Sequence, residues 1–419
     1  MHVKEIIKRM VYNIIVEILQ YGIKPNILKR NNTSTIVDPI FNIERSRVIA
    51  EICNTLMNLD KLGYNTKLPF QVHGLIKRLK ELQNTDGSWN EVHPNYNEPS
   101  VVFTAISALC LLNYYKIYSD NSVISCIKNA KNYLLSQQLS NGGFKKSRLY
   151  HIDALNTDAM ASAFLIKFGK TFNDYQAFKC GLSAAKNICR NQFRDGSYPY
   201  TTPEINFPFK YHLNIPCIHY QTVTLYYLLY VHDEVDEPWL KQSIYQGVVW
   251  LKNKQKSDGS FNWHESGLNF ALYLNATYAF ATYIYYKLLN NCCNHYSIMF
   301  DSLMKLKKSI HNGLILRWES SSWKSFLIDF LYCFKGGFMG DYPLKYKLFR
   351  SMQRVYREVS RRRIFSNKDN FQVKNSILVK LIKDRVFVSM IEPLFNYPDL
   401  YTTAQVLDAL SNLLLLVAS

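Results

Sequence analysis

The stretch Gln83-Asn84-Thr85-Asp86-Gly87-Ser88-Trp89 decides the fold, because the same pattern occurs three more times along the chain. The other copies are Gln138-Leu139-Ser140-Asn141-Gly142-Gly143-Phe144, Gln192-Phe193-Arg194-Asp195-Gly196-Ser197-Tyr198 and Gln255-Lys256-Ser257-Asp258-Gly259-Ser260-Phe261. Their Asp or Asn positions lie 55, 54 and 63 residues apart. A fixed pattern at near-constant spacing indicates a protein built from structural repeats.

A helical pattern stands on each side of these turns. The helices expected before them are amphipathic, as in Leu75–Leu82, and the Asp-Gly or Asn-Gly step supplies a turn with positive φ that ends the helix. The helices expected after them are longer and apolar nearly all round, as in Val101–Leu112 and Asp158–Phe168. A helix that is apolar on every side must be buried. We therefore predict an inner ring of apolar helices inside an outer ring of amphipathic ones.

Two further segments keep the helical pattern but lack the turn, at Val48–Leu59 and Tyr401–Val417. With them the pattern predicts an all-α fold, an α/α toroid of about six helix pairs. We divide the chain into an N-terminal helical segment at residues 1–47 and the toroid at residues 48–419. A basic helical insertion is expected within the toroid at about residues 302–385.

The repeated turn Q-x-x-D-G-S-W resembles that of the terpene cyclase and prenyltransferase group, which includes the squalene–hopene cyclases. The resemblance covers about residues 48–418 and implies a toroid around a cavity lined by aromatic side chains. Aromatic faces suit an isoprenoid chain because they stabilise a carbocation. The resemblance thus implies an isomerase- or lyase-type cyclase of class II character, with a polyprenyl small molecule as its partner. No cofactor is expected, except magnesium if the substrate carries a diphosphate.

The reaction signatures of that group are incomplete in this chain. The D-x-D-D motif of class II cyclases would fall on Ala154-Leu155-Asn156-Thr157, where no acid stands, although Ala159-Met160 follows as in the group. Asp153 and Asp158 flank these positions, which suggests a displaced carboxylic acid. No Asp-Asp pair is present for a magnesium-dependent route. Only Cys217 of a zinc-ligand set of three is kept, so no metal site is predicted.

Four residues near the loops that enter the inner helices are candidate catalytic groups: Glu98, Asp153, Asp158 and His219. Glu98 and Asp153 are equally read as caps of helix N-termini, which carboxylates stabilise. Asp158 lies a turn further into an apolar helix, where a buried carboxylate is costly, and is the favoured acid. His219 is read as a base or as a core histidine with satisfied hydrogen bonds.

Six more residues are candidate substrate-binding groups. The aromatic candidates are Tyr220, Trp263, Tyr273 and Tyr278, and the cationic ones are Arg350 and Arg354.

The positive charge is concentrated in one region. The chain carries a formal charge of +18, and residues 302–385 hold 19 Lys and Arg against 6 Asp and Glu. Within them, residues 344–363 have the pattern of a basic amphipathic helix, which suits an anionic membrane surface or a diphosphate. An outer helix with a solvated face is the alternative. Without a recognition motif, nucleic-acid binding is not expected. No signal peptide and no uninterrupted membrane-spanning run is recognised, so a cytoplasmic protein with peripheral membrane contact is predicted.

Two alternatives to an isoprenoid cyclase stay open at this point. One is a non-catalytic toroid that binds a lipid or a protein. The other is a toroid enzyme with a different substrate, a peptide or a glycan, because the turn motif specifies the fold and not the reaction.

Overall fold

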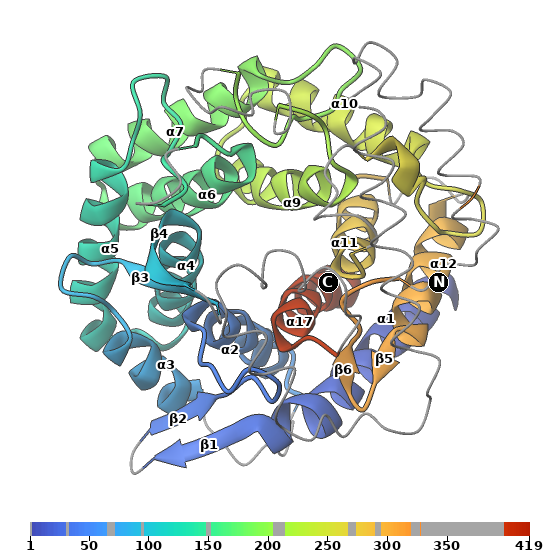
Figure 1. The fold of residues 1–419 in the computed structure, drawn as a ribbon, viewed down its shortest axis with the longest axis horizontal. Coiled ribbons are helices and arrows are strands. Elements are labelled where there is room, and N and C mark those ends of the chain that lie inside the picture. The colour runs from blue at the N-terminus through green and yellow to red at the C-terminus, as the bar shows by residue number, and fades with distance from the viewer. Residues whose placement is uncertain are drawn as a thin grey trace.

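A computed structural model describes residues 2–30, 33–64, 72–93, 96–147, 152–203, 214–266, 274–289, 295–319, 327 and 398–419. Within these residues the helices form two concentric rings (Figure 1). The predicted all-α toroid of about six helix pairs is confirmed.

The inner ring contains the long apolar helices. In the described chain they are α2 (Ser46–Lys61), α4 (Val101–Tyr118), α6 (Leu155–Phe172), α9 (Ile218–Glu234), α11 (Ala276–Leu289) and α17 (Leu400–Ala418). Each packs against the next in chain order, and α17 packs against α2, so the ring closes on itself. Most side chains of these helices are buried, as expected for helices that are apolar nearly all round.

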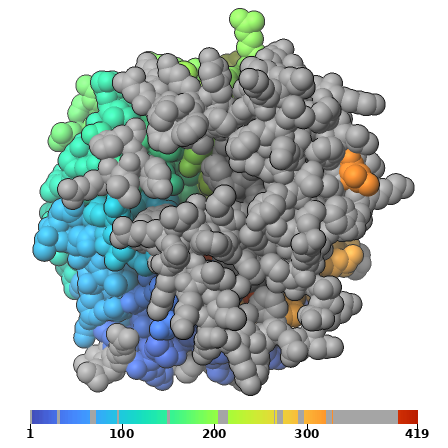
Figure 2. All heavy atoms as spheres, viewed as in Figure 1, coloured from blue at the N-terminus to red at the C-terminus, as the bar shows by residue number. Residues whose placement is uncertain are grey.

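The outer ring contains the amphipathic helices, each packed against its inner partner. They are α1 (His2–Glu17), α3 (Val72–Glu81), α5 (Ile124–Ser136), α7 (Tyr175–Arg190), α10 (Pro238–Asn253) and α12 (His295–Lys308). Helix α1 packs against α17 and α12, so the first residues of the chain lie in the outer ring beside its last helix. A hairpin of β1 (Ile27–Arg30) and β2 (Thr33–Ile36) packs against α3. Seen as spheres, the residues coloured blue to green form a continuous wall on one side (Figure 2).

The repeated turns hold neighbouring outer helices together. In the third copy, Gln192 Nε2 donates to the carbonyl of Gly196 in its own turn at 2.9 Å and to that of Ser243 on α10 at 2.9 Å. Gly196 has φ +91°, and a Cβ atom there would meet the Gln246 carbonyl oxygen at 2.4 Å. The turn therefore needs glycine both for its backbone conformation and for its contact with the next helix.

The other three turns repeat this arrangement. The corresponding Gln side chains bond to the carbonyl of Gly87, Gly142 or Gly259 in their own turn and to Cys126, Cys180 or Ser302 on the next outer helix. Each repeat is thus hydrogen-bonded to the next one, so this local motif stabilises the whole ring.

The turns also tie the outer ring to the inner ring. In the first three motifs the backbone N–H of the final aromatic residue donates to a side chain in the first turn of the following inner helix. Trp89 donates to Thr104 Oγ1 at 2.9 Å, and Tyr198 donates to Gln221 Oε1 at 2.7 Å. Ile315 in β6 (Leu314–Ile315), which pairs with β5 (Ile310–His311), donates likewise to Thr403 Oγ1 at 2.8 Å.

Two inner helices are long and apolar enough to cross a membrane, which differs from the expectation that no such segment exists. They are α4 and α17, and 72% and 78% of the respective windows are buried inside the ring. Core helices of a folded ring meet the same criteria of length and composition, so the finding is weak evidence for a span. Most of the predicted basic insertion at 302–385, including residues 344–363, lies outside the described residues.

Candidate functional site at the centre of the ring

Two of the predicted catalytic residues come together, between the rings. Asn187 Nδ2 on α7 donates to Asp153 Oδ2 at 3.1 Å and to Asp158 Oδ2 at 2.9 Å, and both carboxyl groups are buried. Burial and the neighbouring Asp153 raise the pKa of Asp158 well above its usual value. Asp158 Oδ1 also accepts the backbone N–H of Phe144 at 2.8 Å, the bond that Thr104 and Gln221 make in other repeats.

The second turn explains why an aspartate stands at position 153. Its sequence is Asn141-Gly142-Gly143, where the other turns read Asp-Gly-Ser. In those turns the serine donates to the aspartate, as Ser197 does to Asp195 with N···Oδ1 at 2.9 Å. Here the Asp153 carboxylate lies where a side chain at Gly143 would be, 2.6 Å from an added Cβ, and accepts from Asn141 Nδ2 at 2.7 Å. The observed contacts of Asp153 and Asp158 are thus structural, and their predicted role as acids stays a prediction.

Glu98 lies on a hairpin at the rim of the ring. It belongs to β4 (Tyr96–Ser100), where it pairs in register with Glu91 of β3 (Trp89–His93), while Asp153 forms a bridge with Lys145. Glu98 Oε2 is buried and has no hydrogen-bond partner among the described residues.

His219 lies at the start of α9 and faces α11. Its Nδ1 is 3.0 Å from Thr277 Oγ1, and burial, together with the charges of Arg47 and Arg317, lowers its pKa to about 3. The imidazole is therefore neutral near pH 7 and a weak base. Tyr220 packs beside it and against Tyr200, with the two tyrosine ring centroids 4.6 Å apart.

Trp263 and Tyr278, both predicted to bind substrate, donate hydrogen bonds to the same carboxylate. Trp263 Nε1 and the Tyr278 hydroxyl each donate to Glu319 Oε2 at 2.7 Å, and both side chains are buried. The remaining substrate-binding candidates, Tyr273, Arg350 and Arg354, lie outside the described residues.

A different polar cluster, which the sequence reasoning missed, lies on the inner helices. Arg47 and Glu51, one turn apart on α2, form an ion pair with Nε and Oε1 2.7 Å apart, and both side chains are almost fully buried. Arg47 also donates to the Tyr401 hydroxyl on α17 at 2.6 Å and lies over that ring, 4.9 Å from its centroid. Tyr227 on α9 is close enough for Arg47 to affect its pKa.

Asp408 completes this cluster from α17. The Tyr226 hydroxyl of α9 donates to Asp408 Oδ2 at 2.7 Å, and Asn412 Nδ2 donates to that hydroxyl at 2.9 Å. The contact joins α9 to α17, inner helices separated in the ring by α11. Arg47, Glu51, Tyr226, Tyr227, Tyr401 and Asp408 are called the central cluster below.

The two carboxyl groups of the central cluster have raised pKa values. Burial raises the pKa of Glu51 to about 7, although Arg47 opposes the shift, and the charge of Asp408 adds to it. Burial likewise raises the pKa of Asp408 to about 6, partly offset by the Tyr226 hydroxyl. Glu51 Oε2 and Asp408 Oδ1 are buried and have no hydrogen-bond partner in the described part of the chain. Buried polar atoms without partners are rare and call for an explanation.

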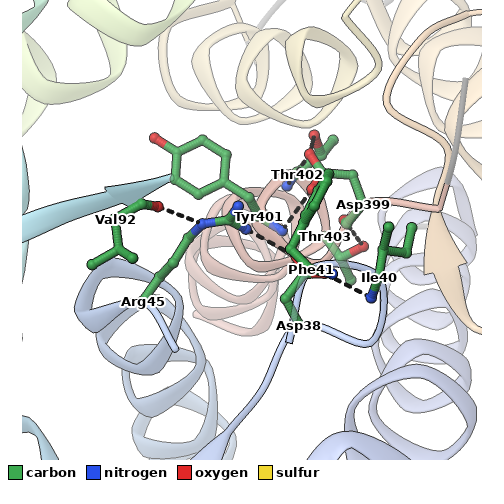
Figure 3. A network of polar contacts seen from close by, with 9 residues as sticks. All are labelled: Asp38, Ile40, Phe41, Arg45, Val92, Asp399, Tyr401, Thr402 and Thr403. Atoms are coloured by element: carbon green, nitrogen blue, oxygen red, sulfur yellow. Dashed lines mark hydrogen bonds and ion pairs between the residues drawn. The ribbon is translucent and has the colours of Figure 1, made fainter. Parts of the chain in front are cut away.

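A second arginine connects the central cluster to the rim. Arg45 pairs with Asp38, with Nη1 and Oδ2 2.9 Å apart, and donates from Nε to the Val92 carbonyl at 3.0 Å (Figure 3). Its guanidinium lies 5.7 Å from the Tyr401 ring centroid. Asp399 caps α17 by accepting from Thr402 N at 3.1 Å, which holds Tyr401 at the mouth of the ring (Figure 3). Two buried arginines, Arg45 and Arg47, thus contact the Tyr401 ring.

The sequence did contain a signal for these residues. Asp408 is the one charged residue of the apolar helical stretch from 400 to 419, and Glu51 interrupts the similar stretch that begins at Val48. A lone carboxylate inside an otherwise apolar inner helix is costly to bury. The same argument that singled out Asp158 applies to both. No group of three or more His, Cys, Asp and Glu side chains in the described residues is arranged to hold a metal ion.

The architecture and the central cluster define an α/α toroid with a polar centre. No family model and no curated protein matches the chain. Solved structures do match. One is the cellobiose 2-epimerase of Bacillus thermoamylovorans, with a TM-score of 0.58, 11% identity, and coverage of 75% of this chain and 92% of that one.

Two further matches are similar. A possible member of the GH105 family from Salmonella enterica has a TM-score of 0.58 and 11% identity, with 98% of this chain and 94% of that chain covered. An unsaturated glucuronyl hydrolase specific for heparin has a TM-score of 0.54 and 12% identity, with 75% and 90% covered. At these identities the likeness establishes the fold.

The expected relation to terpene cyclases is therefore wrong, and with it the isoprenoid partner. The three solved structures described above bear the names of carbohydrate enzymes. The physical reason lies in the turn motif, whose side chains bond to backbone carbonyls of the next outer helix. The motif stabilises the ring and selects no substrate.

Proposed function

We propose that this chain is an enzyme that acts on a glycan at the centre of the ring, with Glu51 and Asp408 as an acid–base pair. The observation that carries the proposal is the pair itself: two buried carboxyl groups on the neighbouring helices α2 and α17, each with one oxygen that lacks a partner in the described chain. Stability alone does not explain such groups, because burying them costs free energy.

The two pKa values suit complementary roles. With a pKa of about 7, Glu51 carries a proton about half of the time near neutral pH and can donate it to a glycosidic oxygen. With a pKa of about 6, Asp408 is mostly ionised at the same pH and can accept a proton from water. Arg47 holds the Glu51 carboxyl through Oε1 and leaves Oε2 for the substrate. Pairs of carboxyl groups in unlike environments support the cleavage of glycosidic bonds.

The nearby imidazole of His219 is a poor candidate for the base of an epimerisation. Removal of a proton next to a sugar carbonyl needs a base with a pKa near the working pH. His219 is held neutral with a pKa of about 3, far below that range. The carboxyl pair is therefore the stronger candidate for proton transfer.

The test compares Glu51→Gln and Asp408→Asn with Asp158→Asn. Hydrolysis would be followed by the release of reducing ends from neutral and uronate-containing oligosaccharides, and by the release of nitrophenol from aryl glycosides. Proton NMR would detect an epimer. We expect Glu51→Gln and Asp408→Asn to lose at least about a hundredfold in kcat, the usual contribution of one acid–base group. Thermal unfolding would check that both variants are folded.

Asp158→Asn serves as the matched variant, because Asp158 is equally buried but lies between the rings. A folded Asp158→Asn variant that loses turnover while Glu51→Gln keeps it would overturn the central pair and favour the assignment made from the sequence.

A further inference from the structure

A groove on the outer wall, away from the central cluster, has the side chains of a binding site. It lies between the adjacent helices α7 and α10 and has a volume of about 420 Å³. It is lined by Lys186, Cys189, Arg190, Gln192, Trp239, Gln242, Ser243 and Gln246. None of these lining residues is acidic.

Helix α7 contributes two positive charges to the groove. Lys186 and Arg190 stand four residues apart, so their side chains share one face of the helix. Like charges at this spacing repel each other, and within the described chain neither cation has an ion-pair partner. The C-terminal end of α7 stabilises Arg190, but Lys186 lies a turn further in, where that effect fades.

Helix α10 faces them with an aromatic ring and two amides. The Trp239 indole N–H donates to Glu237 Oε2 at 2.7 Å, which holds the ring in one orientation, and Lys186 Nζ lies 5.8 Å from the ring centroid. Gln242 and Gln246 are exposed and one turn apart on the same helix. By contrast, Gln192 and Ser243 bond to each other and belong to the structural turn.

We propose that this groove binds an acidic saccharide, a sugar that carries a carboxylate or a sulfate group. The anionic group would lie between Lys186 and Arg190, the sugar ring would pack on Trp239, and the hydroxyl groups would bond to the amides of Gln242 and Gln246. A simple inorganic anion would use only the cations, whereas the tryptophan and the amides fit a ring with hydroxyl groups. The inference rests on the proposed function, since a second sugar site would hold a polymeric glycan near the ring.

The experiment measures binding to the full chain by calorimetry and by tryptophan fluorescence. The probes are digalacturonate, a neutral disaccharide of the same size, and sodium sulfate. The key variants are the double variant Lys186→Gln, Arg190→Gln and the single variant Trp239→Phe. The matched control is Lys128→Gln, Lys179→Gln, which removes two exposed charges from α5 and α7 outside the groove.

We expect digalacturonate to bind at least about tenfold more weakly to the Lys186, Arg190 double variant, and less than about twofold more weakly to the control. The fluorescence change should vanish in Trp239→Phe. The proposal would be overturned if the neutral disaccharide or sulfate bound as tightly as digalacturonate. It would also be overturned if the double variant bound digalacturonate as tightly as the unaltered chain.

Failure of the groove proposal can be told apart from failure of the proposed role of Glu51 and Asp408. Glu51→Gln should bind digalacturonate in the groove as the unaltered chain does, and the groove variants should keep turnover of short aryl glycosides. Loss of groove binding in Glu51→Gln would also contradict the inference, because it would place the saccharide at the centre of the ring.

Discussion

Asp408→Asn should make the protein more stable at alkaline pH while abolishing its activity. Asp408 is buried on α17, and its carboxyl accepts a hydrogen bond from the Tyr226 hydroxyl at 2.7 Å. Burial raises its pKa from 3.8 to about 6. Asparagine has nearly the same shape and can accept the same hydrogen bond, but it cannot ionise. The substitution therefore removes the buried charge and leaves the packing in place.

The magnitude follows from linkage between protonation and folding. A pKa that is higher in the folded chain than in the unfolded one means that folding favours the protonated form. Stability is then full below about pH 4 and falls as the pH rises through about 6. At 1.36 kcal/mol for each pKa unit, ionised Asp408 costs about 3 kcal/mol above pH 7. The stability difference between Asp408→Asn and the unaltered chain should change by about that amount between pH 4 and pH 8.

Urea unfolding at pH 4, 6 and 8 would measure this difference. Any effect of the amide on packing is the same at each pH and cancels in the comparison. Asp120→Asn is a control of opposite sign, because the Ser122 N–H, 2.8 Å from Asp120 Oδ1, lowers the pKa of that half-buried carboxyl. It should cost stability near neutral pH and little in acid. The prediction is wrong if the stability difference for Asp408→Asn does not change with pH, or if it favours the unaltered chain at pH 8.

Two further predictions concern the repeated turns. Gly196→Ala should lower the free energy of unfolding by about 3 kcal/mol, because it combines positive-φ strain with a clash against the Gln246 carbonyl. Gly63→Ala, with φ +73° and open space around it, should cost only about 1 kcal/mol. Equal losses of the two variants in urea unfolding would contradict this prediction. Gly143→Ser introduces the residue of the other turns but should destabilise the fold by about 2 kcal/mol, since the added Cβ would meet the Asp153 carboxylate at 2.6 Å. Adding Asp153→Ala to the same chain should recover part of that loss. Strictly additive effects in a double-mutant cycle would contradict a clash between the two residues.

The candidate residues predicted from the sequence rest on two kinds of evidence, a resemblance and the cost of buried charge. Resemblance to one enzyme group led to Asp153 and Asp158, which lie between the rings on Asn187. The cost of burying a charge is a sounder guide, because it singles out Glu51 and Asp408 as well as Asp158. His219 and Tyr220 lie at the start of α9, and the low pKa of His219 comes from burial and from Arg47, which lies far away in the sequence.

By itself the sequence determined the toroid, because the information for it is local. Each seven-residue turn carries its own glycine, its own Gln and its own aromatic residue, and the pattern of apolar residues separates inner from outer helices. Tertiary structure alone decided the candidate site. Arg47 and Tyr401 are 354 positions apart, and Tyr226 and Asp408 are 182 apart, so no local pattern connects them. They meet because the ring closes α17 on α2, and the low polarity inside that ring then raises the pKa values of Glu51 and Asp408.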